Sequence, residues 1–272
     1  MPAAARPPCQ AGPVTARPDP DLDGGPRAEG VRARARRELV RQIADAARDQ
    51  LAEVGAAALS VRAVTRQLGM APSAVYRYFP NRDALLTALI TDAYVGLADA
   101  AADAEAAVPR ADLLGRWLAV HRAVRGWALG HPHEYALIYG SPVPGYVAPE
   151  DTAAPASRVA LLLAGIAVEG WVAGGRPAAG AAGALPGAAL GDALLADARA
   201  LLGTALEGVE GVDASAVDPR LPLAVVDAWT ELFGAVSFEL FGHYRRVVEA
   251  RAEHLDDVAR RTAAAVGLPP GS

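Results

Sequence analysis

Residues 59–86 of the chain have the sequence LSVRAVTRQLGMAPSAVYRYFPNRDALL. Apolar side chains recur at helical spacing in two short runs, with Val64 and Leu68 in the first and Val75 and Phe79 in the second. A glycine separates the runs, and a proline stands where the first turn of the second helix would begin. The segment therefore predicts two short helices that meet across a tight turn, which is the layout of a helix-turn-helix.

The second of these helices has a face suited to nucleic acid. When its apolar residues point to the core, the opposite face presents Ser73, Ala74, Arg77 and Tyr78. These side chains are small, hydroxylic, basic or aromatic, and a helix of about two turns can enter a major groove by its N-terminal end. We therefore expect this helix to contact DNA.

Charge is distributed unevenly along the chain. The formal net charge is −5, which by itself argues against a general nucleic-acid binder. Residues 27–91, however, hold eleven arginines against six acidic residues, whereas residues 92–272 hold thirteen against twenty-two. A small basic segment is thus joined to a large acidic one, which concentrates the affinity for phosphate in one module.

The composition predicts an all-α chain. Apolar residues make up 52% of the sequence, and no run of alternating β-branched residues is bounded by turns.

The first residues lack the basic and apolar segments of a secretory signal, and no run of about 18 apolar residues is without charge, glycine or proline. We therefore expect a cytoplasmic protein with no membrane partner.

Groups that catalysis or a metal would need are scattered. The single cysteine, Cys9, has no second cysteine for a disulfide or a metal site. His131, His133 and Glu134 are neighbours, but their spacing suits a metal poorly, and a turn at the start of a helix is the alternative. Neither a GxSxG nucleophile motif nor a GxxxxGK[ST] phosphate loop is present. We expect no enzymatic activity, no metal and no cofactor.

Three regions follow from the pattern. Residues 1–30 are rich in proline and are expected to form a disordered leader. Residues 31–104 should form the DNA-binding domain, and residues 110–265 should form a helical bundle that mediates dimerisation, with Val108-Pro109 at the boundary. Helices are expected at about 31–54, 60–68, 72–79, 82–104, 110–130, 132–140, 154–173, 188–208, 221–242 and 243–265.

The helix-turn-helix segment resembles the DNA-binding domain of the TetR family of repressors. The similarity covers residues 37–91 and is carried by Gly69, Ser73, Val75, Tyr76, Arg77, Tyr78, Phe79 and Arg82. Three positions depart from the family pattern: Ala71 stands where a capping serine is frequent, Tyr78 replaces a common histidine, and Arg82 replaces a common lysine. The side chains of Tyr78 and Arg82 are the two that matter for phosphate contacts. Both side chains can still donate a hydrogen bond to a phosphate.

The resemblance and the helix geometry together indicate which residues contact DNA. They are Ser60, Arg62, Pro72, Ser73, Ala74, Tyr76, Arg77, Tyr78 and Arg82. Tyr76, Tyr78 and Arg82 are expected on phosphates, and Arg62 is the first candidate for bonding O6 and N7 of a guanine. Packing of Tyr76 on the preceding helix, and a solvated surface charge for Arg62 or Arg77, remain open alternatives.

For residues 110–265 the resemblance implies a cavity for a small effector. The candidate lining residues are Trp117, His121, Trp127, Tyr135, Tyr139 and Trp171. Tryptophan and tyrosine combine apolar area with one polar group, which suits a ligand pocket, although an ordinary core is the alternative for each residue. The spacing of Trp229, Gly234, Phe238 and Gly242 also resembles TetR-type regulators with a C-terminal WHG-like domain.

Dimerisation is expected through helices near 188–208 and 221–242. The second of these has a broad apolar stripe, more than the core of one monomer needs. A two-fold homodimer would hold two recognition helices about 34 Å apart, or more, on a palindrome. The resemblance to the TetR family implies a repressor that a small-molecule effector releases from its operator. A ligand-independent regulator or activator acting through protein contacts, and a helical enzyme with a DNA module, are the alternatives.

Overall fold

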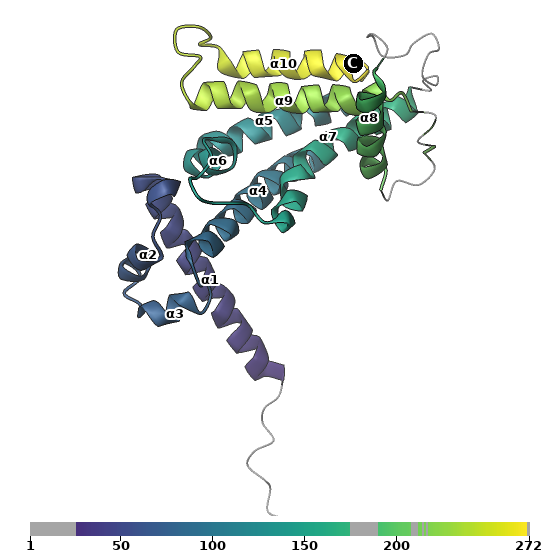
Figure 1. Ribbon diagram of the computed structural model, residues 1–272. Coiled ribbons are helices and arrows are strands. Elements are labelled where there is room, and N and C mark those ends of the chain that lie inside the picture. Colours follow the sequence, from purple (N-terminus) through teal and green to yellow (C-terminus); the bar gives the residue numbers. More distant parts are fainter. Residues whose placement is uncertain (1–25, 175–189, 208–211, 214, 216, 271–272) are drawn as a thin grey trace, which may run out of the picture. The chain divides into compact units, whose positions relative to one another are not determined.

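The computed structural model describes residues 26–174, 190–207, 212–213, 215 and 217–270 (Figure 1). These residues form helices and no strand, which confirms the all-α class. The chain divides into two compact units, residues 1–42 and 43–272. Of the leader expected at residues 1–30, residues 1–25 lie outside the described residues, and residues 26–30 are helical.

The first unit holds the beginning of α1 (Pro26–Val54). This helix starts five residues before the expected position, and a proline, whose φ is already helical, occupies its first position. Side chains from Gly30 to Glu38 are exposed, and Glu38 pairs with Arg41 at 2.6 Å. This stretch of α1 is therefore a solvated helix within its own unit.

The second unit begins with a small helical head. It comprises the remainder of α1, the short turn η1 (Ala56–Ala58), α2 (Val61–Gln67) and α3 (Pro72–Tyr76). Val64, Val75 and Phe79, which the helical spacing placed in the core, are buried together with Ile43, Ala46, Ala47 and Leu51 of α1. Leu68, predicted on the same apolar face, is only half-buried. The head is thus built around a continuous apolar core with α2 and α3 packed on each other.

The bend between α2 and α3 depends on Gly69. Its φ is +64°, in the left-handed region that favours glycine. The Gly69 N–H donates to the Arg66 carbonyl at 3.2 Å, and the Met70 N–H donates to the Thr65 carbonyl at 3.0 Å. These two bonds form a Schellman motif, which satisfies the last carbonyls of α2 and fixes the direction of α3.

The recognition helix is shorter than the sequence predicted. The expected helix continued to Phe79, but α3 ends at Tyr76. The N–H groups of Tyr78 and Phe79 both donate to the Val75 carbonyl, at 2.9 and 3.0 Å, so the chain tightens into a turn before Pro80. Asn81 then begins α4, and its side chain accepts from the Ala84 N–H at 2.8 Å.

Six further helices follow α4 (Arg82–Ala106) in the described part of the chain. They are α5 (Leu113–Gly130), α6 (Pro132–Tyr139), α7 (Ala153–Ala173), α8 (Asp192–Ala205), α9 (Arg220–Leu240) and α10 (Arg251–Ala265), with the short turn η2 (Glu150–Thr152) before α7. The largest departure is at α10, which was expected from residue 243. Residues 241–250 instead form turns, in which Gly242 has a φ of +82°.

These helices share one core. Helix α4 packs on α5, α6 and α7, and α9 lies beside α10 in Figure 1 and also contacts α5, α7 and α8. Helix α4 runs from the head into this core, and Val108-Pro109 lies in the turn between α4 and α5. Ion pairs stabilise the end of α4. Arg116, which is 1% exposed, bonds the buried Glu105 of α4 and also bonds Glu169 of α7 at 2.6 Å.

Among the described residues, three helices are long and apolar enough, by length and composition, to cross a membrane. They are α4, α9 and the helical segment Glu150–Ala173, with mean hydropathies of 1.4, 1.3 and 1.5. In each, 44% of the most apolar window is buried inside the protein. The packing described above therefore accounts for much of their apolar surface.

Candidate nucleic-acid interface

Helix α3 presents an exposed polar face above a fixed apolar base. Val75 is fully buried and Phe79 nearly so, as the sequence predicted, and they anchor the segment in the head. Ser73 and Arg77 are exposed, and the Tyr76 ring is 38% exposed, so this ring is not part of the core. Ala74 and Tyr78 are half-buried at the margin of the same face.

The first turn of α3 has no side-chain cap. Ala71 occupies the N-cap position and makes no capping hydrogen bond, while Pro72 lies in the first turn and lacks an N–H to satisfy. The Ser60 side chain likewise makes no capping bond at the start of α2, and the Ser60 N–H donates to Gln50 at 3.5 Å. The absence of caps leaves N–H groups of both short helices open to an external acceptor.

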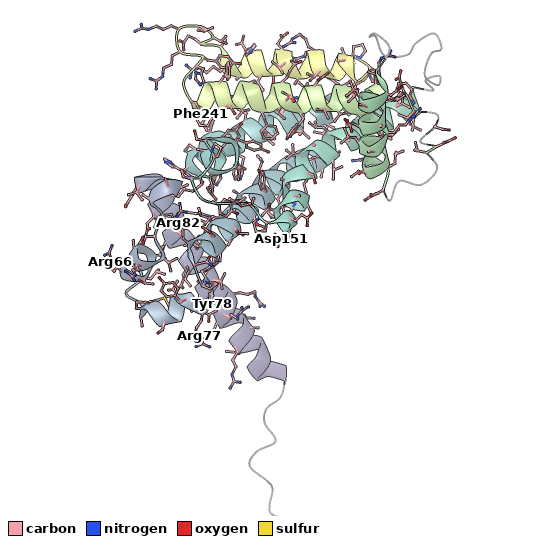
Figure 2. All side chains as sticks on the ribbon, in the orientation of Figure 1. Arg66, Arg77, Tyr78, Arg82, Asp151 and Phe241 are labelled. Atoms are coloured by element: carbon pink, nitrogen blue, oxygen red, sulfur yellow. The ribbon has the colours of Figure 1, made fainter. Side chains whose placement is uncertain are left out.

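Three arginines of the head are exposed without an ionic partner in the described part of the chain. Arg62 and Arg66 lie four residues apart on α2 and so share one face, and Arg77 follows α3. No side-chain hydrogen bond or salt bridge of these three arginines is found within the described residues. Arg66 was not singled out from the sequence, although its spacing from Arg62 could have indicated it. Figure 2 labels Arg66, Arg77 and Tyr78 along the part of the head that α2 and α3 form.

Arg82 is placed differently from these three. Its guanidinium donates to the carbonyls of Ala56 and Ala57, at 2.9 and 3.2 Å, and lies 3.8 Å from Asp83. The side chain therefore ties η1 to the start of α4. Only the N–H groups left over from these bonds are available to a phosphate.

Arginines of the helical bundle are mostly paired with carboxylates. Arg122 makes two bonds to Asp256, at 2.8 and 2.7 Å, and Arg125 makes two to Glu239, both at 2.7 Å. Further ion pairs hold Arg110, Arg116, Arg158, Arg251 and Arg261. Within the described residues, Arg199, Arg245, Arg246 and Arg260 of the bundle also make no ion pair. The head differs in that Arg62, Arg66 and Arg77 belong to its two short helices and the turn after them.

The six candidate ligand residues do not form one group. Trp117 and His121 are fully buried and lie 5.5 Å apart, and the Trp117 indole donates to Thr262 of α10 at 3.2 Å. Trp127 stacks on His131 at 4.8 Å, and Trp171 is buried in α7. Tyr135 and Tyr139 lie 5.1 Å apart, near α9. Only these two tyrosines belong to a larger aromatic group.

Burial leaves some polar atoms of the bundle without a hydrogen-bond partner. These atoms are His121 Nε2, the Tyr139 hydroxyl and Trp229 Nε1. Burial lowers the pKa of His121 to about 4, against the opposing effects of a hydrogen bond to the Trp117 carbonyl and the charge of Asp256. His121 is therefore a neutral core residue at physiological pH. Among the described residues, no group of three His, Cys, Asp or Glu side chains could hold a metal, and Cys9 lies outside those residues.

Comparisons with known proteins agree with this geometry. Residues 43–89 match the family model of bacterial regulatory proteins of the tetR family, and residues 117–265 match the tetracyclin repressor-like C-terminal domain. The chain belongs to the TetR family. HTH-type transcriptional regulators of Mycobacterium tuberculosis (strain H37Rv) and Mycobacterium bovis are each 40% identical over 218 residues, which cover 79% of this chain and 86% of theirs. This TetR-family protein is thus a DNA-binding transcriptional regulator.

One solved structure is similar over most of its length. The crystal structure of regulatory protein SCO4313 is 30% identical, has a TM-score of 0.62, and covers 85% of this chain and 98% of its own. The first matched region contains α2, α3 and the exposed arginines, so this family's DNA-binding module coincides with the surface described above.

Proposed function

We propose that this regulator is a cytoplasmic, homodimeric repressor that leaves a palindromic operator when a small-molecule effector binds its helical bundle. The observation that carries the DNA-binding part is the exposed face of α3, where Ser73, Tyr76 and Arg77 surround a buried anchor and the positive charge has no partner within the described residues. Phosphate oxygens and guanine edges supply the acceptors that this face lacks. No catalytic role is included in the proposal.

Individual residues have distinct roles in the proposed complex. Arg77 and Arg62 contact base edges or adjacent phosphates, Tyr76 donates its hydroxyl to a phosphate, and Tyr78 does so from the margin of the face. Ser60, Pro72, Ser73 and Ala74 let the two backbones approach, because small side chains leave room. Arg82 positions η1 and α4, and contacts a phosphate with its remaining N–H groups.

DNA fragments that the purified protein retains from its own genome provide the test. A retained fragment is labelled, and its affinity is measured by fluorescence anisotropy for the wild type and for the double variant Tyr76→Phe/Arg77→Ala. We expect the variant to lose roughly tenfold to a thousandfold in affinity, because a phosphate contact and a charged contact are removed. Arg158→Ala, which removes the same charge from the bundle, should bind like the wild type.

A pair of subunits is supported by an apolar surface on α7, α8 and α9. Leu161, Leu201 and Val226 are large, exposed side chains that line one small apolar pocket of about 70 Å³ between these helices. The stripe predicted on α9 is largely used within the monomer, where Val225, Leu232 and Val236 are buried. The remaining exposed apolar residues are those that a second copy would cover.

Sedimentation measures this association directly. The wild type should sediment as a dimer, whereas Leu201→Glu/Val226→Glu should sediment as a monomer with unchanged helix content. The control Val247→Glu alters an equally apolar and more exposed side chain in the turn between α9 and α10. A monomeric wild type, or a dimer that survives the double charge substitution, would rule out this interface.

The effector part of the proposal separates it from a ligand-independent regulator or activator. Operator affinity is measured with and without extracts of small molecules from the source cells. A repressor of the proposed kind loses affinity by the coupling free energy, about 1–3 kcal/mol. Operator affinity that no fraction changes would favour the ligand-independent alternative.

A further inference from the structure

A cluster of aromatic side chains lies where α4, α6 and α9 meet. The aromatic cluster consists of Tyr94, Tyr135, Tyr139, Trp229, Phe233 and Phe241. The Tyr139 ring is central, with its centroid 4.3 Å from Phe233, 5.1 Å from Tyr135 and 6.0 Å from Tyr94. Trp229 adjoins Phe233 at 5.8 Å. Figure 2 labels Phe241, at the end of α9, whose ring lies 6.4 Å from that of Tyr135.

Hydrogen bonds are satisfied for only part of the cluster. The Tyr135 hydroxyl lies 2.9 Å from Ser237 Oγ and donates to the Phe233 carbonyl at 3.2 Å, and the Tyr94 hydroxyl donates to the Ile138 carbonyl at 3.5 Å. The Tyr139 hydroxyl and Trp229 Nε1 are buried and have no partner. The rings of Tyr139 and Trp229 both adjoin the ring of Phe233. Buried donors are rarely left unpaired without a reason, because their desolvation is not repaid.

The carboxylate of α9 that lies between Phe233 and Phe241 in the sequence is already paired. Glu239, on the turn of α9 between Phe233 and Phe241, is engaged by both guanidinium bonds of Arg125. Burial raises the pKa of Tyr135 to about 12 and that of Tyr139 further, so both phenols are neutral at physiological pH. An ionised ligand would therefore enter without a counter-charge, which is strongly unfavourable in an apolar interior.

We propose that the aromatic cluster binds an uncharged, largely apolar ring compound whose hydrogen-bond acceptor is held by the Tyr139 hydroxyl and the Trp229 indole N–H. The inference rests on the proposed effector response and names the class of the effector. The indole N–H can only donate, so the ligand must supply an acceptor such as a carbonyl or ether oxygen. The surrounding rings supply the apolar contact area.

Helix α6 connects this site to the DNA-binding head. Tyr135 and Tyr139 are in the cluster, whereas Glu134 on the same helix accepts from Arg48 of α1 at 3.1 Å. Arg48 also pairs with Asp92 of α4 at 2.8 Å. A cleft of about 420 Å³ separates α6 and the loop after it from the end of α1 and η1. A ligand that parts α6 from α9 therefore acts on the contacts that hold the head.

The probe for this site is prodan, 6-propionyl-2-(dimethylamino)naphthalene. It is uncharged, has two fused rings and one carbonyl acceptor, and its emission shifts to shorter wavelength in apolar surroundings. Saturable binding is expected for the wild type. Tyr139→Phe and Trp229→Phe should each weaken binding about fivefold, since each removes one donor.

Two further measurements separate binding from a structural role. Tyr139→Phe deletes a hydroxyl without a partner, so its Tm should equal or exceed that of the wild type while prodan affinity falls. Tyr146→Phe, which removes a hydroxyl bonded to Thr87 outside the cluster, should retain prodan affinity. The anion 2-naphthoate should compete weakly, because the site has no free positive charge.

Several results would overturn the assignment. They are the absence of saturable prodan binding up to its solubility limit, equal affinities in wild type and both cluster variants, or competition by 2-naphthoate as strong as by uncharged naphthalene ketones. Operator binding is measured on the same samples without prodan. Intact operator binding together with no prodan binding rejects the ligand class alone, whereas absence of operator binding in the wild type rejects the proposed function.

Discussion

The head and the aromatic cluster both hold donors without partners, but in opposite surroundings. Arg62, Arg66 and Arg77 are exposed, so water solvates their guanidinium groups when no partner is bound. Tyr139 and Trp229 instead keep their unpaired donors away from water. The exposed arginines are therefore stable without a ligand. The buried donors lower the stability of the fold by their desolvation, and a ligand that accepts their hydrogen bonds would remove this cost.

Because one set of donors is exposed and the other buried, the two sites select their partners in different ways. A surface of exposed arginines suits a long polyanion, and its affinity depends strongly on salt. A buried site accepts only a molecule of matching shape and polarity. Substitutions in the two regions test whether their polar groups contribute to stability or to binding.

The largest expected contrast is between buried and exposed arginine. Arg116→Met removes the buried guanidinium that bonds both Glu105 and Glu169, and leaves the buried Glu105 with only the exposed Arg110. It should lower the free energy of unfolding by about 3–5 kcal/mol. Arg77→Ala should change it by less than about 0.5 kcal/mol, because an exposed side chain without a partner is removed. Urea unfolding followed by circular dichroism measures both. Equal decreases would show that the head arginine is structural too.

A buried histidine should make the bundle sensitive to acid. The pKa of His121 is near 4 when folded, against 6.5 when unfolded, so the unfolded chain takes up this proton first as the pH falls. Stability from this residue is complete above about pH 6.5 and decreases progressively toward pH 4. Between pH 7 and pH 5 the wild type should lose roughly 2 kcal/mol more than His121→Phe. Parallel pH profiles of the two proteins would contradict this account.

A smaller effect separates two tyrosines of the aromatic cluster. Tyr135→Phe removes a hydroxyl bonded to Ser237 and to the Phe233 carbonyl, and should lower stability by about 1 kcal/mol. Tyr139→Phe should cause no destabilisation, because its hydroxyl has no partner. Thermal unfolding of the two variants under one buffer gives the comparison. Equal destabilisation would indicate that Tyr139 has a partner in solution.

Local signals made the head predictable from sequence. Gly69 and Pro72 mark the turn, and the apolar spacing placed Val75 and Phe79 in the core, where the structure has them. The length of α3 was overestimated because periodicity continues past Tyr76, whereas the backbone tightens at Val75. The carbonyl bonds of Arg82 were not foreseen, since they depend on how η1 folds back beside α4.

The interior of the bundle was predictable only as a list of aromatic residues. Sequence spacing cannot tell that Tyr139 meets Phe233, far along the chain, while Trp117 turns to Thr262 on α10. These pairings depend on the packing of helices distant in sequence. The start of α10 was predicted eight residues too early. Residues 243–250 have a helical composition, but they form turns after Gly242.

The central claim is that the unpaired arginines of α2 and α3 bind DNA. Its most direct test is the slope of log affinity against log salt concentration for a retained operator fragment. Arg62→Ala/Arg66→Ala/Arg77→Ala should reduce this slope by about one for each phosphate that the variant no longer binds. Arg158→Ala/Arg260→Ala/Arg261→Ala, with the same change of charge on the bundle, should keep the wild-type slope. Equal slopes in the wild type and both triple variants would contradict the claim.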